Sequence, residues 1–148
     1  MQKWSLVVLI LLLSGAVTPA MAADTGRYGY ITVEQVDIYL VNDKATVDIS
    51  YKIDDGIQFI VLLLGKSDLR TKLEYIVDYN GAEFKKIELD HAVLEIENAS
   101  IDYNDGSYWF PEHEFGITLP RLVITTPQVK KEFTNTSVLP TGVGHFKT

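Results

Sequence analysis

The sequence of 148 residues contains no cysteine, and this absence excludes several kinds of site. Disulfides, zinc–cysteine centres, iron–sulfur clusters and thiol catalysis all require cysteine side chains. We therefore expect a disulfide-free fold that is held together by apolar burial and hydrogen bonds. A chain of this length is large enough to bury such a core without covalent cross-links.

Basic residues are also scarce, with 13 Lys and Arg against 20 Asp and Glu and a formal net charge of −7. Binding to a phosphate backbone depends on clustered Lys and Arg, so we expect no nucleic-acid partner. The acidic charge favours solubility and repels an anionic membrane surface.

The N-terminal residues have the pattern of a secretory signal peptide over residues 1–22. Lys3 precedes the apolar stretch Trp4–Val17, and Ala20-Met21-Ala22 supplies the small residues of a cleavage site between Ala22 and Ala23. An uncleaved membrane anchor is the alternative, but the apolar stretch is shorter than the roughly 20 residues that span a bilayer. We therefore expect a secreted or extracytoplasmic protein, in the periplasm or at the cell surface, with no stable membrane span in its mature form.

Alternating apolar and polar residues predict a β-hairpin after the leader. Apolar residues alternate through Tyr30–Val41, with a slip at Glu34-Gln35 that indicates a β-bulge. Asn42-Asp43-Lys44 is a turn signal, and the alternation resumes over Ala45–Asp54.

Residues Ile57–Leu64 are apolar nearly all the way round, which fits either a buried strand or a buried helix. A helix is favoured because the leucines at its end are not β-branched and because a second helical pattern follows. In that pattern Leu69, Leu73, Ile76 and Val77 recur at helical spacing. We expect a helical hairpin inserted after the second strand, one part buried and the other amphipathic.

Strand patterns return over 83–89, 91–101, 115–126 and 128–134, with Pro120 indicating an edge or a bulge. The fold class predicted is α+β, with an antiparallel β-sheet of about five to seven strands and the inserted helical hairpin. The alternative is an all-β sandwich in which Ile57–Leu64 is a buried strand. We expect one small globular domain over 23–148, ordered over about 30–135, with a loose C-terminal tail.

Three segments have partial resemblance to chemical motifs, and each lacks an essential feature. Gly65-Lys66-Ser67 has no glycine five positions earlier, as a phosphate-binding loop requires. The glycine of Asp102–Gly106 is one position too early for a calcium loop. Neighbouring side chains in Glu112-His113-Glu114 alternate faces in a strand. We therefore assign no catalytic, cofactor-binding or metal-binding residue and expect no cofactor.

The aromatic run Tyr108, Trp109 and Phe110 is the strongest candidate for a binding patch. Consecutive side chains in a strand point to opposite faces, so either both faces are covered or one ring is left for a protein or carbohydrate partner. Asn98 and Asn135 begin N-glycosylation sequons, which are relevant in an exported chain.

The hypothesis drawn from these patterns is an exported, non-catalytic structural or binding module at the cell surface. The alternative is a protein that binds an apolar ligand or a membrane surface through Ile57–Leu64. A second alternative is a small secreted hydrolase, although no nucleophile motif is present.

Overall fold

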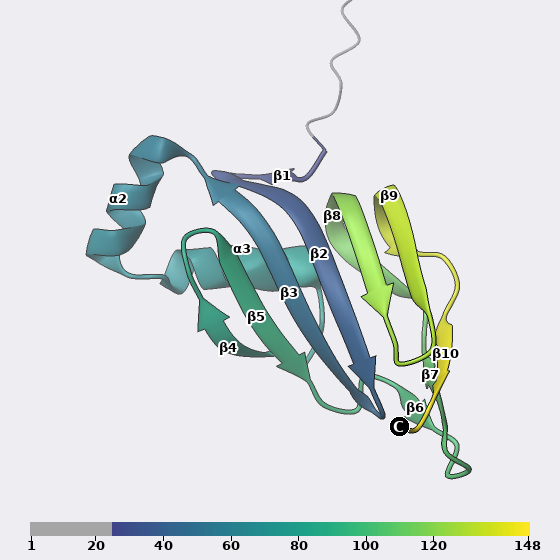
Figure 1. Ribbon diagram of the computed structural model, residues 1–148. Helices are drawn as coiled ribbons and strands as arrows, with labels where there is room; N and C mark the ends of the chain where they lie inside the picture. Colours follow the sequence, from purple (N-terminus) through teal and green to yellow (C-terminus); the bar gives the residue numbers. More distant parts are fainter. Residues whose placement is uncertain (1–24) are drawn as a thin grey trace, which may run out of the picture.

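The computed structural model describes residues 25–148 and shows an α+β fold (Figure 1). It contains a mixed seven-stranded sheet, a three-stranded sheet and two helices. The predicted signal peptide over 1–22 and its cleavage site at Ala22 and Ala23 lie outside the described residues.

The predicted first hairpin is confirmed. Strands β2 (Ile31–Val41) and β3 (Lys44–Ile53) pair antiparallel through a two-residue turn in which Asn42 has a φ of 55°. The register shifts between Val33 and Gln35, where the sequence indicated a bulge. The alternating apolar side chains of both strands are buried in the core, as their period of two requires.

The large sheet has the order β4-β5-β3-β2-β8-β9, with the short β1 (Arg27–Tyr28) paired to β2. On one side of the hairpin lie β5 (His91–Ile96) and the edge strand β4 (Glu83–Ile87). On the other side lie β8 (His113–Thr125) and the edge strand β9 (Lys130–Leu139).

The prediction of a wholly antiparallel sheet is not confirmed, because β2 and β8 run parallel. After β5 the chain passes through the small sheet to the far side of β2 and enters β8 in the same direction as β2 (Figure 1). A long connection of this kind permits parallel pairing, whereas a tight turn imposes the antiparallel direction.

The small sheet consists of β6 (Ile101–Asp102), β7 (Ser107–Phe110) and β10 (Val143–Phe146), with β7 in the middle. The sequence predicted a loose C-terminal tail, but the structure instead pairs β10 with β7. Val143 and His145 are buried and alternate with exposed residues, so this short strand has one face against the core.

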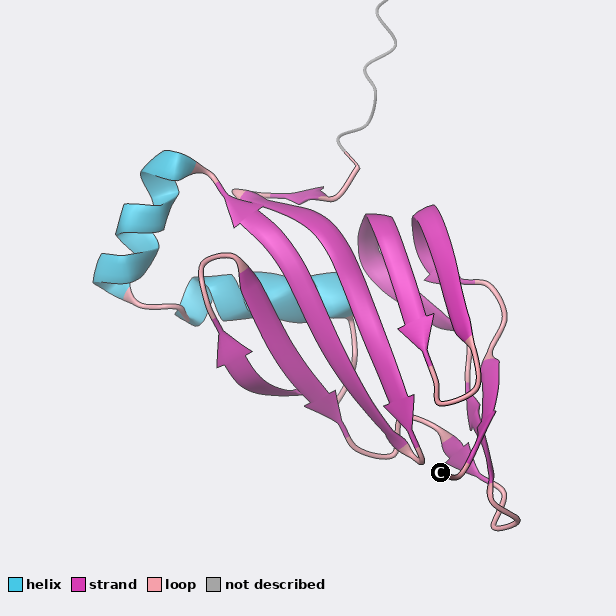
Figure 2. Cartoon of the chain, in the orientation of Figure 1, coloured by secondary structure: helices cyan, strands magenta, loops and turns pink. Residues whose placement is uncertain are grey.

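Two helices, α2 (Asp55–Leu64) and α3 (Ser67–Val77), connect β3 to β4, so the fold is not an all-β sandwich. Helix α3 lies across the sheet and buries Leu69, Leu73, Ile76 and Val77, as its spacing predicted. Helix α2 stands beyond the corner of the sheet (Figure 2). The predicted packing of the two as a hairpin is therefore not confirmed, and the prediction that Ile57–Leu64 is buried is wrong.

Candidate binding surface

Helix α2 begins at the end of β3 and is fixed there by a charged pair. The Asp54 carboxylate, immediately before the helix, accepts hydrogen bonds from the Arg27 guanidinium of β1 at 3.3 and 2.8 Å. Gly65, with a φ of 91°, ends the helix in a conformation that side chains disfavour. The start of the helix is therefore fixed by a contact with β1, and its end is set by Gly65.

Only one narrow side of α2 contacts the rest of the protein. Val61 is 6% exposed and is the helix's only buried residue, while Ile57 and Gln58 are half-buried beside it. The Gln58 amide donates a hydrogen bond to the carbonyl oxygen of Ile53 at 3.0 Å. These contacts hold the helix in place but cover little of its apolar surface.

The remaining side of α2 is apolar and open to solvent. We name it the α2 face, and it consists of Phe59, Ile60, Leu62, Leu63 and Leu64. Phe59 is 66% exposed, Leu63 67% and Leu64 82%. A surface helix normally turns its apolar stripe inward and its polar side outward, whereas α2 exposes large apolar side chains and has only one charged residue, the exposed Asp55 of its first turn. No other element in the described part of the chain contributes more than two exposed large apolar side chains.

A shallow cleft of about 250 Å³ runs along the inner margin of this face. Ile57, Ile60 and Leu64 line its helix side, and the Tyr30 hydroxyl donates a hydrogen bond to Asp68 (2.7 Å) on its other side. Burial, together with this bond to a carboxylate, raises the pKa of Tyr30, so the phenol is neutral at physiological pH. The cleft therefore has an apolar wall on the helix side, and the Tyr30 hydroxyl and the Asp68 carboxylate lie on the opposite side.

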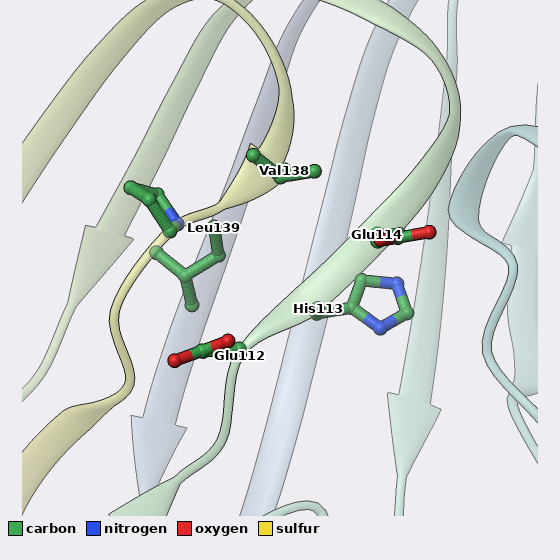
Figure 3. Close-up of a pocket in the computed structure, with 6 residues that line it drawn as sticks. Glu112, His113, Glu114, Val138 and Leu139 are labelled. Atoms are coloured by element: carbon green, nitrogen blue, oxygen red, sulfur yellow. The ribbon is translucent and has the colours of Figure 1, made fainter.

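The segment Glu112-His113-Glu114 lines a separate cleft of about 420 Å³, and Figure 3 shows its three side chains pointing in different directions. The His113 Nε2–H donates to the carbonyl oxygen of Val77, the last residue of α3, at 2.7 Å. The ring also stacks on Tyr79 at 3.9 Å, and burial lowers the pKa of His113. His113 therefore has a structural role. No group of three or more potential metal ligands is present among residues 25–148.

The other motif fragments also have structural roles. Asp102 accepts the backbone N–H of Asn104 (2.8 Å), and Asp105 accepts the N–H of Ser107 (2.9 Å), so both carboxylates stabilise the turn before β7. The Lys66 ammonium binds the carbonyl of Ile87 and the Glu88 carboxylate instead of facing a phosphate-binding loop.

Ser100 and His145 are buried close to the β2–β3 turn. The Ser100 N–H donates to Asp43 (3.1 Å), and the His145 Nε2–H donates to the carbonyl of Asn42 (2.8 Å). Ser100 Oγ and His145 Nδ1 have no hydrogen-bond partner within the described structure, so they do not bond to each other. Because both side chains are shielded from solvent, this pair offers a substrate no accessible nucleophile.

The aromatic run places one ring at the surface. Tyr108 and Phe110 are buried, whereas Trp109 on the opposite face is 39% exposed. The Trp109 ring lies against the start of β10, and a Cβ added at Gly142, the residue before this strand, would come within 2.4 Å of it. Glycine at 142 therefore leaves room for the indole to cover the strand. The expectation of one accessible ring thus applies to Trp109 alone.

Both sequon asparagines are exposed, with left-handed φ values of 53° at Asn98 and 51° at Asn135. Ser100, which completes the first sequon, is buried, while Ser137, at the end of the second, is exposed. The second sequon is therefore the more accessible in the folded protein.

The sequence pattern singled out Ile57–Leu64 but predicted that this segment is buried, whereas most of it is exposed. The pattern did not indicate the cleft beside it, to which Tyr30 and Asp68 contribute. The paired acids Asp54-Asp55 and the glycines at 56 and 65 were the available signal, since they isolate the helix from the elements on either side. No pattern indicated the contact between Tyr30 and Asp68, which are 38 residues apart.

Comparison of the chain with protein-family models, curated proteins and solved structures finds no match. Between residues 25 and 148, no helix is both long enough and apolar enough to cross a membrane.

Proposed function

We propose that the protein is an exported, non-catalytic module that binds an apolar surface through the α2 face. The observation that carries this proposal is a helix whose outward side is apolar beyond Asp55 in its first turn, with Phe59 and Leu63 about two-thirds exposed one turn apart at its centre. Large exposed apolar patches on soluble proteins mark interaction sites.

Burial of the α2 face against a partner would contribute a substantial binding free energy. Complete burial of a Leu or Phe side chain is worth about 1.5–3 kcal/mol, so covering one that is two-thirds exposed is worth about 1–2 kcal/mol. The four most exposed residues of the face together give about 4–8 kcal/mol by this area argument. This is comparable to the net stability of a small domain.

Export is part of the proposal and is supported by the leader pattern. Lys3, the apolar Trp4–Val17 and the small residues around Ala22 fit a cleaved signal peptide. A location outside the cytoplasm agrees with the sequons at Asn98 and Asn135, whose asparagines are both exposed. The proposal gives the His113 ring and the Asp102 and Asp105 carboxylates a structural role, because they hydrogen-bond to the carbonyl of Val77 and to the turn before β7.

Binding of an apolar fluorescent dye tests the α2 face directly. The variant Phe59→Ser/Leu63→Ser is compared with Tyr39→Ser/Val41→Ser, a matched control that removes two exposed apolar side chains from β2. We expect the α2 variant to lose most of the dye fluorescence and the β2 variant to retain it. Equal dye binding by the two variants would refute the assignment of the α2 face, and hydrolysis of a substrate in a broad screen would refute the non-catalytic role.

Trp109 supports a second candidate function, the binding of a protein or carbohydrate partner at the small sheet. Its exposed indole is preorganised by the glycine backbone of β10, and a flat aromatic surface of this kind suits stacking against a partner. Titration with oligosaccharides while Trp109 fluorescence is recorded tests this candidate. A Trp109→Ala variant must abolish any response that is attributed to the site.

A further inference from the structure

We infer that the α2 face docks on the surface of a lipid bilayer, an assignment of partner that rests on the proposed function. Every side chain from Phe59 to Leu64 is apolar, so the exposed part of the face offers a partner no hydrogen bond. Hydrocarbon is the partner that requires none, because it has no polar groups to satisfy. Helices with a wide apolar side lie in the interface in this way.

The path of the chain places α2 close to where residues 1–24 join the described structure. Arg27 of β1 binds Asp54, immediately before α2, and Figure 1 shows β1 at the same end of the molecule as this helix. Seven residues separate the apolar segment Trp4–Val17 from Thr25, and they span at most about 25 Å. Until the leader is cleaved, α2 therefore lies within reach of the bilayer that holds this segment, and after cleavage the α2 face is left as the contact with that surface.

The dimensions of α2 disfavour the other occupants. A helix of ten residues is about 15 Å long, so two copies packed face to face bury much less than the roughly 1,200 Å² of a stable interface. The adjoining cleft of about 250 Å³ is smaller than the roughly 300 Å³ at which ligand pockets begin. Both arguments favour a partner that is flat and extended, as a bilayer is.

The charge of the protein predicts which bilayer α2 prefers. Helix α2 contains no Lys or Arg, and the whole chain has a net charge of −7. Attraction to anionic lipids therefore contributes nothing, in contrast to a basic amphipathic helix. We expect attachment of α2 to uncharged vesicles to be at least as strong as attachment to anionic vesicles, and added salt to strengthen the latter by screening repulsion.

The absence of native cysteine makes a single-site probe experiment clean. The chain without its leader, residues 23–148, carries Leu63→Cys labelled with an environment-sensitive fluorophore and is mixed with phosphatidylcholine vesicles that contain spin-labelled lipid. Tyr103→Cys is the matched control, because Tyr103 is similarly exposed but lies in the turn of the small sheet at the other end of the molecule (Figure 1). We expect severalfold stronger quenching by the lipid at position 63 than at 103, with a blue-shifted emission.

Equal quenching at positions 63 and 103, while the chain remains vesicle-bound, would overturn the bilayer inference. It would leave the proposed function intact if Phe59→Ser/Leu63→Ser still abolished dye binding in the absence of vesicles. A probe at 63 that responds to protein concentration without lipid would instead assign the face to a second copy. In the uncleaved chain, a disulfide that forms between Leu63→Cys and Leu9→Cys in the absence of lipid would assign the face to the chain's own N-terminal segment.

Discussion

Truncating one leucine on each helix compares the exposed α2 with the buried α3 by the same chemical change. Leu73 of α3 is fully buried, so Leu73→Ala removes its buried methyl groups and leaves a cavity, at a cost of about 2–5 kcal/mol. Leu63 of α2 has only about a third of its side chain covered, so Leu63→Ala costs less than about 1 kcal/mol. The better helix propensity of Ala further reduces this cost.

Urea unfolding followed by far-UV circular dichroism measures both free energies. With net stabilities of about 5–15 kcal/mol for natural domains, Leu73→Ala removes a large fraction and Leu63→Ala a small one. The unfolding midpoint therefore moves clearly to lower urea for Leu73→Ala and scarcely for Leu63→Ala. If Leu63→Ala were as destabilising as Leu73→Ala, the α2 face would be buried in the free protein and its proposed binding role would be refuted.

Further substitutions test other parts of the structure. Gly116→Ala places a Cβ 2.1 Å from the carbonyl oxygen of Tyr75 in α3 and should destabilise the protein by about 1–3 kcal/mol in thermal unfolding. Gly56 lies in α2 with open space around it, so Gly56→Ala should stabilise the protein by about 0.5–1 kcal/mol. Ser100→Ala removes a buried hydroxyl that has no partner within the described structure, so it should leave the stability unchanged or raise it. Thr126→Ala loses hydrogen bonds from two backbone N–H groups and should lower the stability by about 1–3 kcal/mol. If calorimetry found Ser100→Ala the more destabilising of the two, the hydrogen-bond assignment would be contradicted. Burial lowers the pKa of His113 below its ordinary 6.5, so the unfolded chain binds more protons than the folded one and stability should fall as the pH drops below about 6.5. His113→Gln should flatten this pH dependence of stability. An unchanged slope in the variant would show that His113 does not cause it.

The strands with regular alternation could be predicted from sequence because one of their faces is buried. The five inward residues of β2 and the bulge beside Glu34 follow from the period of two and its single slip. Helix α3 was equally predictable, since Leu69, Leu73 and Ile76 form one apolar stripe.

The parallel pairing of β2 with β8 was not predictable, because local patterns specify the faces of a strand but not its distant neighbour. Strand β10 was missed for a related reason. It has four residues, two of them Gly144 and the buried His145, and it becomes a strand only through its pairing with β7.

The burial of α2 was mispredicted because hydrophobicity alone does not say what covers a helix. An apolar run normally lies in the core, and no polar residue stands between Phe59 and Leu64 to indicate an outward side. Whether α2 is buried or exposed depends on where the chain leaves β3, and that point places α2 beyond the corner of the sheet (Figure 1).

Thiol accessibility at position 63 in the purified, lipid-free protein tests the central claim most directly. The chain has no native cysteine, so Leu63→Cys, Tyr103→Cys and Leu73→Cys each report on one site. An exposed α2 face predicts that a maleimide labels position 63 as rapidly as the exposed position 103, and position 73 only when the protein unfolds. Protection of position 63 to the level of position 73 would contradict the account.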